Sequence, residues 1–269
     1  MNWDDIYRQI PKEVEETRKE YILKNSIIKD DIFRILEKHC EVVYYPFDDE
    51  EKSRGFHIKR FMKDKLVDFV YINTAKSVAD QIFGAAHELG HVWGVAAKIW
   101  EQLNYKEELT EDVEEIIVNR FAAELLMPKD IFRKTFFLHI EELGFNKKKI
   151  RLEEILRVMV MQMSDYIVPY EAVRRRLVET NIVTEDIGRV LNAENNPIEE
   201  IVKIYSKELN ATFSNPTGKK TIPGLRDALL EAERKGALSD YVILKVKQDF
   251  DLEEVATTDE LLNISGEDE

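Results

Sequence analysis

The chain has 269 residues, and its 53 acidic side chains outnumber its 39 basic ones, giving a formal charge of −14. This balance argues against a free-standing polyanion binder, because such proteins carry a basic face that neutralises phosphates. With no apolar run of the ~18–20 residues that span a membrane, no signal-peptide pattern and a single cysteine, Cys40, the sequence predicts a cytoplasmic protein.

The first half of the chain alternates between helical and extended patterns. Residues 1–40 place apolar side chains at helical spacing among charges, which predicts helix. Three short extended runs follow, at 42–45, 55–58 and 66–72. The links between them are too short for crossovers, so we expect one small antiparallel sheet. A long helix is predicted from about 77 to 100, and a second from about 111 to 127, ending at Pro128.

The second half of the chain has helical patterns almost throughout. Residues 130–190 are predicted to be wholly helical, and further helices are predicted at 197–210 and 223–250. The region 251–269 is acidic and terminal, which favours disorder. The fold class is therefore α+β and mostly helical.

A metal-binding motif lies within the first long predicted helix. His87 and His91 are the histidines of an H-E-x-x-H sequence. Residues at i and i+4 share one helix face, so both imidazoles can reach one metal ion. Glu88 follows His87 and is placed to take a proton from a zinc-bound water molecule, as a general base.

An open catalytic zinc site of this type needs a third protein ligand. The next predicted helix offers Glu115 as that ligand and Asn119 one turn later, where its amide can orient a histidine from outside the ligand shell. Glu114 points about 100° away from this face and fits it less well. Glu111 and Asp112 are better explained as acids that favour a helix N-terminus.

Two segments together resemble the ImmA/IrrE family of zinc metallopeptidases. They are YINTAKSVADQIFGAAHELGHVW (Tyr71–Trp93) and EEIIVNRFAAELLMP (Glu114–Pro128). The resemblance implies that His87, His91 and Glu115 bind zinc and that Glu88 is catalytic. The sequence differs from the family pattern at Gly84, where threonine is common, but this difference removes no ligand.

The resemblance also implies an architecture for the whole chain. A small antiparallel sheet would pack on a zincin-like two-helix metal site, and a helical C-terminal part would follow. We therefore divide the chain into a zincin-like metallopeptidase core, a helical subdomain, a helical C-terminal region and an acidic tail, at 1–130, 131–190, 191–250 and 251–269.

Other residues have weaker claims to function. His57 and His139 are candidates for stabilising the oxyanion of a tetrahedral intermediate, and Tyr170 is a third, although packing roles are commoner for such residues. The basic cluster Arg174–Arg176 raises the question of DNA contact. Glutamates flank it at helical spacing, which favours internal ion pairs over direct nucleic-acid binding.

The leading hypothesis is a zinc-dependent endopeptidase that hydrolyses a peptide bond in a specific regulatory protein. The resemblance implies that the substrate is a repressor or regulator encoded nearby. The first 40 residues hold no obvious DNA-binding domain, so we expect the substrate to be a separate protein. The alternative is a metal-binding regulatory or toxin–antitoxin-type interaction protein without general proteolytic activity.

Overall fold

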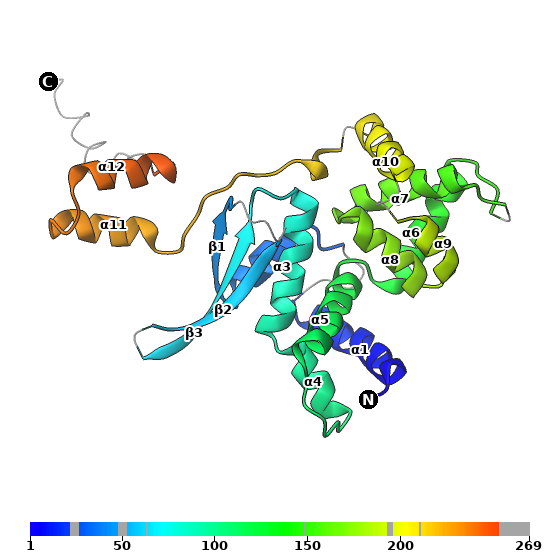
Figure 1. Ribbon diagram of the computed structural model, residues 1–269, viewed down its shortest axis with the longest axis horizontal. Coiled ribbons are helices and arrows are strands. Elements are labelled where there is room, and N and C mark those ends of the chain that lie inside the picture. Colours follow the sequence, from blue (N-terminus) through cyan, green and yellow to red (C-terminus); the bar gives the residue numbers. More distant parts are fainter. Residues whose placement is uncertain are drawn as a thin grey trace, which may run out of the picture. The chain divides into compact units, whose positions relative to one another are not determined.

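The protein is described by a computed structural model, shown in Figure 1. It describes residues 1–21, 27–47, 53–62, 64–147, 149–192, 196–209 and 211–252. The chain forms two compact units, Met1–Gly218 and Lys219–Glu269. The finer division at 130, 190 and 250 stays a prediction, and most of the acidic tail, from 253 onward, lies outside the described residues.

The sheet of the first unit is small and mixed rather than antiparallel. Its strands are β1 (Glu41–Tyr45), β2 (Gly55–Met62) and β3 (Lys65–Asn73), in the order β1-β3-β2. β2 and β3 pair antiparallel as predicted, but β1 pairs parallel with β3. The prediction of an antiparallel sheet was wrong for β1, because a short link constrains only the two strands that it joins. Strand β2 itself lies between β1 and β3 in the sequence, which lets the chain return in the same direction.

Two helices carry the predicted metal ligands: α3 packs against β2 and β3, and α5 packs on α3. Helix α3 (Val78–Val92) begins at Ser77, whose hydroxyl accepts the backbone N–H of Asp80. The long predicted helix ends early, because Gly94 has a φ of 61° and separates α3 from α4 (Val95–Gln102). Helix α5 (Glu111–Leu126) confirms the second predicted helix, and it packs against α1, α3 and α4.

Helices make up most of the rest of the first unit, which confirms the mostly helical α+β class. At the N-terminus lie α1 (Trp3–Tyr21) and α2 (Asp31–Glu37), and α1 packs against α5. The later helices are α6 (Lys129–Glu142), α7 (Leu152–Tyr166), α8 (Tyr170–Glu179), α9 (Glu185–Val190) and α10 (Asn196–Glu208). Buried apolar side chains from these helices and from the sheet form one continuous core.

A short segment after α10, residues 212–218, returns to the first turn of α3; we call it the strap. It begins with the 3-10 helix Thr212–Ser214. Asn215 accepts the backbone N–H of Val78 through its carbonyl at 2.9 Å, and the N–H of Gly218 donates to the carbonyl of Thr74 at 3.0 Å. The strap therefore pairs with backbone groups at the start of the helix that carries the motif.

The second unit contains α11 (Leu225–Arg234) and α12 (Asp240–Asp249). Leu229 and Ile243 are its buried apolar side chains. Across the described parts of both units, no helix combines the length and apolar character needed to cross a membrane.

Candidate active site

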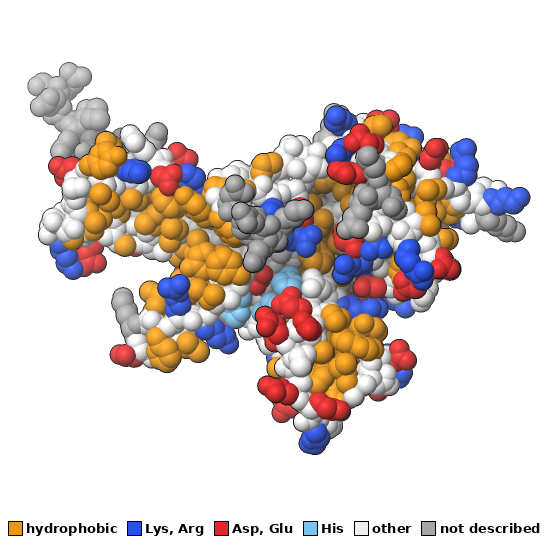
Figure 2. All heavy atoms as spheres, in the orientation of Figure 1, with side chains coloured by type: hydrophobic (Ala, Val, Ile, Leu, Met, Phe, Trp, Pro, Cys, Tyr) orange, Lys and Arg blue, Asp and Glu red, His pale blue; other side chains and the backbone are white. Residues whose placement is uncertain are grey.

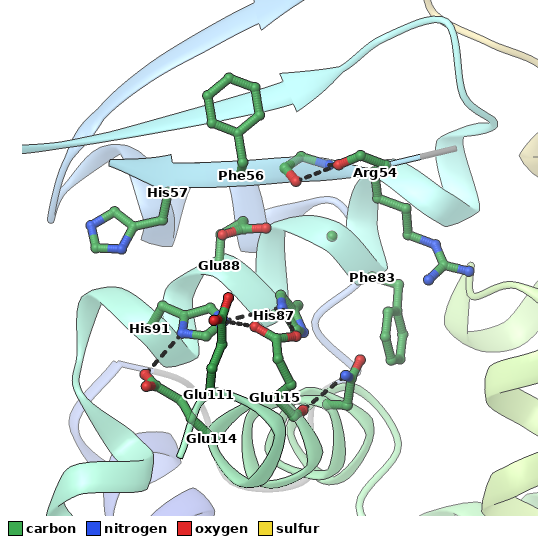
Figure 3. Close-up of a pocket in the computed structure, with 14 residues that line it drawn as sticks. Arg54, Phe56, His57, Phe83, His87, Glu88, His91, Glu111, Glu114 and Glu115 are labelled. Atoms are coloured by element: carbon green, nitrogen blue, oxygen red, sulfur yellow. Dashed lines mark hydrogen bonds and ion pairs between the residues drawn. The ribbon is translucent and has the colours of Figure 1, made fainter. Parts of the chain in front are cut away.

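Three of the predicted site residues bring nitrogen and oxygen atoms to one point. His87 and His91 project from α3, and Glu115 projects from α5 toward them (Figure 3). The two histidine Nε2 atoms are 3.2 Å apart. Glu115 places Oε1 3.0 Å from Nε2 of His91 and Oε2 3.3 Å from Nε2 of His87. The spacing of i and i+4 thus puts both imidazoles on one helix face, opposite a carboxylate from a second helix.

This donor set fits a tetrahedral metal ion. Nitrogen and oxygen ligands bound at about 2.0–2.1 Å on a tetrahedron lie roughly 3.3 Å from one another. The three contacts between His87, His91 and Glu115 span 3.0–3.3 Å, close to that value. Two imidazoles and one carboxylate are also the donor chemistry of catalytic zinc sites, in which a fourth position stays open. These three residues form the one cluster of potential metal ligands among the described residues.

Glu88 lies next to this cluster and has the environment of a proton-transfer group. Its side chain is 5% exposed, and burial raises the pKa of its carboxyl above the ordinary range, although both histidines act in the opposite direction. The hydrogen bond from His87 instead lowers the pKa of Glu115, which favours the ionised form that a metal ligand requires. The two carboxyls therefore differ in the direction that their predicted roles require.

The group that orients a histidine is not the one expected from the sequence. Oε1 of Glu114 lies 3.1 Å from Nδ1 of His91, an arrangement that favours the tautomer with the proton on Nδ1 and the lone pair of Nε2 directed at the cluster. Asn119 instead donates from Nδ2 to the backbone carbonyl of Glu115 at 2.8 Å. Asn119 thus contacts the backbone of a predicted ligand, and the carboxylate beside His91 Nδ1 is that of Glu114.

The cluster opens into a cavity of about 680 Å³. Strand β2 forms one wall; in Figure 3, His57 lies on the side of this strand that faces the histidines, and the Phe56 ring lies on the other side. Phe83 of α3 and Arg54 lie at one end of the cavity. His57 is held by Asp68, whose Oδ1 lies 2.6 Å from His57 Nε2. No pattern in the sequence singled out Arg54, Phe56 or Phe83, which come from a loop, from strand β2 and from the turn of α3 before His87.

The other candidates lie away from this cavity. His139 lies on α6 with Nε2 2.6 Å from Asp165 Oδ2, and this hydrogen bond raises the pKa of His139. The hydroxyl of Tyr170 donates to the carbonyl of Leu191 at 2.8 Å. Arg176 is 2% exposed and pairs with Glu124 and Glu179, so its charge is neutralised within the fold and does not face a nucleic acid.

Comparison with known proteins gives a family for the chain. The IrrE N-terminal-like domain, Peptidase_M78, matches residues 37–178, more than half of the 269 residues. No curated protein matches the sequence. A solved structure of a Mycobacterium tuberculosis transcriptional regulator is similar with a TM-score of 0.43 and 14% identity, over 65% of this chain and 49% of that chain.

This chain therefore spans about half the length of that regulator, and the likeness carries no argument about function. The family match, by contrast, contains the whole three-donor cluster and Glu88. Because it also covers more than half of the sequence, the chain belongs to the IrrE N-terminal-like domain family of peptidases.

Proposed function

We propose that this chain is a zinc-dependent endopeptidase that cleaves a regulatory protein. The observation that carries the proposal is the cluster of His87, His91 and Glu115 beside the buried carboxyl of Glu88. In this cluster the two Nε2 atoms are 3.2 Å apart, and each lies 3.0–3.3 Å from one carboxylate oxygen of Glu115. A zinc ion held by such donors lowers the pKa of a water molecule to about 7 and polarises a carbonyl.

Side chains around the cluster would transfer protons, orient a ligand and contact the substrate. Glu88, with its raised pKa, would accept the proton of the attacking water and pass it to the leaving amine. Glu114 would hold His91 in the tautomer that presents Nε2. His57, on the opposite wall of the cavity and held by Asp68, has its imidazole available to a substrate there.

The substrate would bind as an extended peptide along β2. This strand pairs with β3 on one side only, so it is an edge of the described sheet, and its first residues line the cavity. An edge strand offers free backbone N–H and C=O groups to which a peptide can add by hydrogen bonding. We propose that the peptide belongs to a separate protein, a repressor or regulator encoded nearby.

Metal analysis and cleavage assays test this proposal in two stages. Purified wild type is expected to contain close to one zinc per chain, and the His91→Ala variant is expected to lose it. A wild-type chain that takes up no zinc would refute the proposal.

Cleavage is then measured on the product of the neighbouring gene, by intact-mass spectrometry of the fragments. The Glu88→Gln variant keeps every ligand, so we expect it to retain zinc and to lose cleavage by at least about 10²-fold. If Glu88→Gln supports the same biological response as wild type, metal binding rather than proteolysis is the function.

A further inference from the structure

A second cavity adjoins the candidate active site. It measures about 420 Å³ and shares three lining residues with the first cavity: Arg54, Phe83 and Asn119. Its other walls come from α1, α5 and α8, all within the first compact unit. A peptide in the first cavity can therefore place a side chain in the second without leaving the surface.

Arg54 lies where the two cavities meet and is held in one orientation. Its Nε donates to Oδ1 of Asp80 at 2.8 Å, and its guanidinium carbon lies 5.5 Å from the centre of the Phe83 ring. In Figure 3 its guanidinium points away from His87 and lies beside Phe83. Among the described residues, neither Nη atom has a hydrogen-bonding partner, so both can donate to a ligand.

Gly84 permits this position. A Cβ atom on Gly84 would lie 3.0 Å from the Cβ of Arg54, closer than most real contacts, so a larger residue would displace the Arg54 backbone or side chain. The position of Arg54 therefore depends on the absence of a side chain at Gly84.

The second cavity carries an excess of positive charge. Arg120 and Arg175 line it together with Arg54. The two glutamates that line it are each shared between two arginines. Glu171 pairs with Arg174 and Arg175, and Glu179 pairs with Arg120 and Arg176. Neither glutamate pairs with Arg54, whose carboxylate partner among the described residues is Asp80. Asp80 accepts from Nε alone, so the two Nη groups of Arg54 still form the donor fork that matches a carboxylate.

The first cavity has the opposite character. Four glutamates line it, Glu88, Glu111, Glu114 and Glu115, against the single cation Arg54. Acidic side chains gather beside the histidines in Figure 2, and basic ones lie immediately to their right in that view. Even with a divalent ion bound, a carboxylate on a substrate is more stable at the arginine end than near Glu111 and Glu114.

We propose that the second cavity is a substrate subsite that accepts an aspartate or glutamate side chain close to the scissile bond, with Arg54 as its specificity-determining residue. This inference rests on the proposed peptidase function and names its class of substrate. A charge-assisted pair with a partly exposed arginine favours glutamate over glutamine by about tenfold in kcat/KM.

The test uses the full-length, zinc-loaded protein and pools of fluorogenic peptides with glutamate, glutamine or lysine fixed at one position at a time. Wild type is expected to cleave the glutamate pool about tenfold faster than the glutamine pool at one fixed position. Arg54→Gln is expected to bring that ratio close to one, and Arg54→Glu to favour lysine instead. A reversed preference requires a folded site, so it separates recognition from simple loss of structure.

Arg60→Gln is the matched control, since Arg60 lies on β2, the strand that follows Arg54, is exposed and lines neither cavity. It is expected to keep the wild-type ratio. Absence of a glutamate preference in wild type, or its survival in Arg54→Gln, would overturn the inference.

A binding measurement keeps the two proposals distinguishable. Fluorescence anisotropy with labelled versions of the same pools compares Glu88→Gln with the double variant Glu88→Gln/Arg54→Gln. If wild type cleaves no pool but the glutamate pool still binds about tenfold more tightly through Arg54, proteolysis fails and the acidic subsite stands. Equal binding of the glutamate and glutamine pools refutes the subsite.

Discussion

Replacing Glu114 by alanine is expected to weaken zinc binding by about tenfold. Its carboxylate lies 3.1 Å from Nδ1 of His91 and is the partner that fixes the tautomer of that ligand. Loss of such a partner typically lowers metal affinity by about 10–100-fold. We expect the lower end because the Glu114 side chain is 37% exposed, and water can replace part of the hydrogen bond.

The matched control is Glu111→Ala. Glu111 lies on the first turn of the same helix and lines the same cavity, but no hydrogen bond or ion pair joins it to either histidine among the described residues. Its removal takes away one negative charge without the hydrogen bond, and salt screens that effect at 0.15 M. We expect at most about a twofold change. Glu114→Gln keeps an acceptor for Nδ1–H and is expected to fall between the two.

Zinc affinity would be measured by competition with a chromophoric chelator at constant pH, at about 0.15 M and 0.5 M salt. The difference between Glu114→Ala and Glu111→Ala should persist at the higher salt, because a hydrogen bond acts at short range. Equal losses in the two variants would show that Glu114 acts only through its charge. No loss in either would refute the assigned orientation of His91.

Three further predictions concern the scaffold and are measured by urea denaturation. A Cβ on Gly90 would lie 2.8 Å from Cγ1 of Val118. Gly90→Ala should therefore lower the free energy of unfolding by about 1 kcal/mol, net of its gain in helix propensity, and a Val118→Ala background should abolish that loss. The pKa of His139 is raised by its hydrogen bond to Asp165, so the folded state binds the proton more tightly than the unfolded chain. The stability advantage of wild type over His139→Gln should be fully present below pH ~6.5 and should shrink as the pH rises through the raised pKa; a constant gap would refute this. Arg176 is buried with ion-pair partners, so Arg176→Met should destabilise the fold by about 3–5 kcal/mol, and a loss under 1 kcal/mol would contradict its assigned role.

The parts of the site that depend on local spacing could be predicted from the sequence. His87 and His91 share a face of α3 because four residues separate them, and no tertiary contact is needed to place them together. Glu115 comes from a second helix, and the structure places its carboxylate beside both histidines. The ends of α5 were also predictable, because an acidic first turn and Pro128 mark them.

The parts that depend on how elements cross could not be predicted in this way. An ideal helical angle placed Glu114 off the site face, but the side chain is long, and α5 passes α3 where that side chain reaches His91. Arg54 lies about 30 residues before the motif in an irregular segment, where neither period nor composition marks a ligand-binding residue. The parallel pairing of β1 with β3 likewise depends on strand order, which local patterns do not encode.

The strap shows that the segment matched by the family and the segment needed to complete the fold do not end at the same residue. The family match ends at residue 178, and a fragment cut there would keep every proposed zinc ligand. It would lack Asn215 and Gly218, and with them the backbone partners of Val78 and Thr74 at the start of α3. The helix that holds the histidines is thus completed by polypeptide made well after it, so during synthesis the site would reach its final form only after the chain extends beyond the strap.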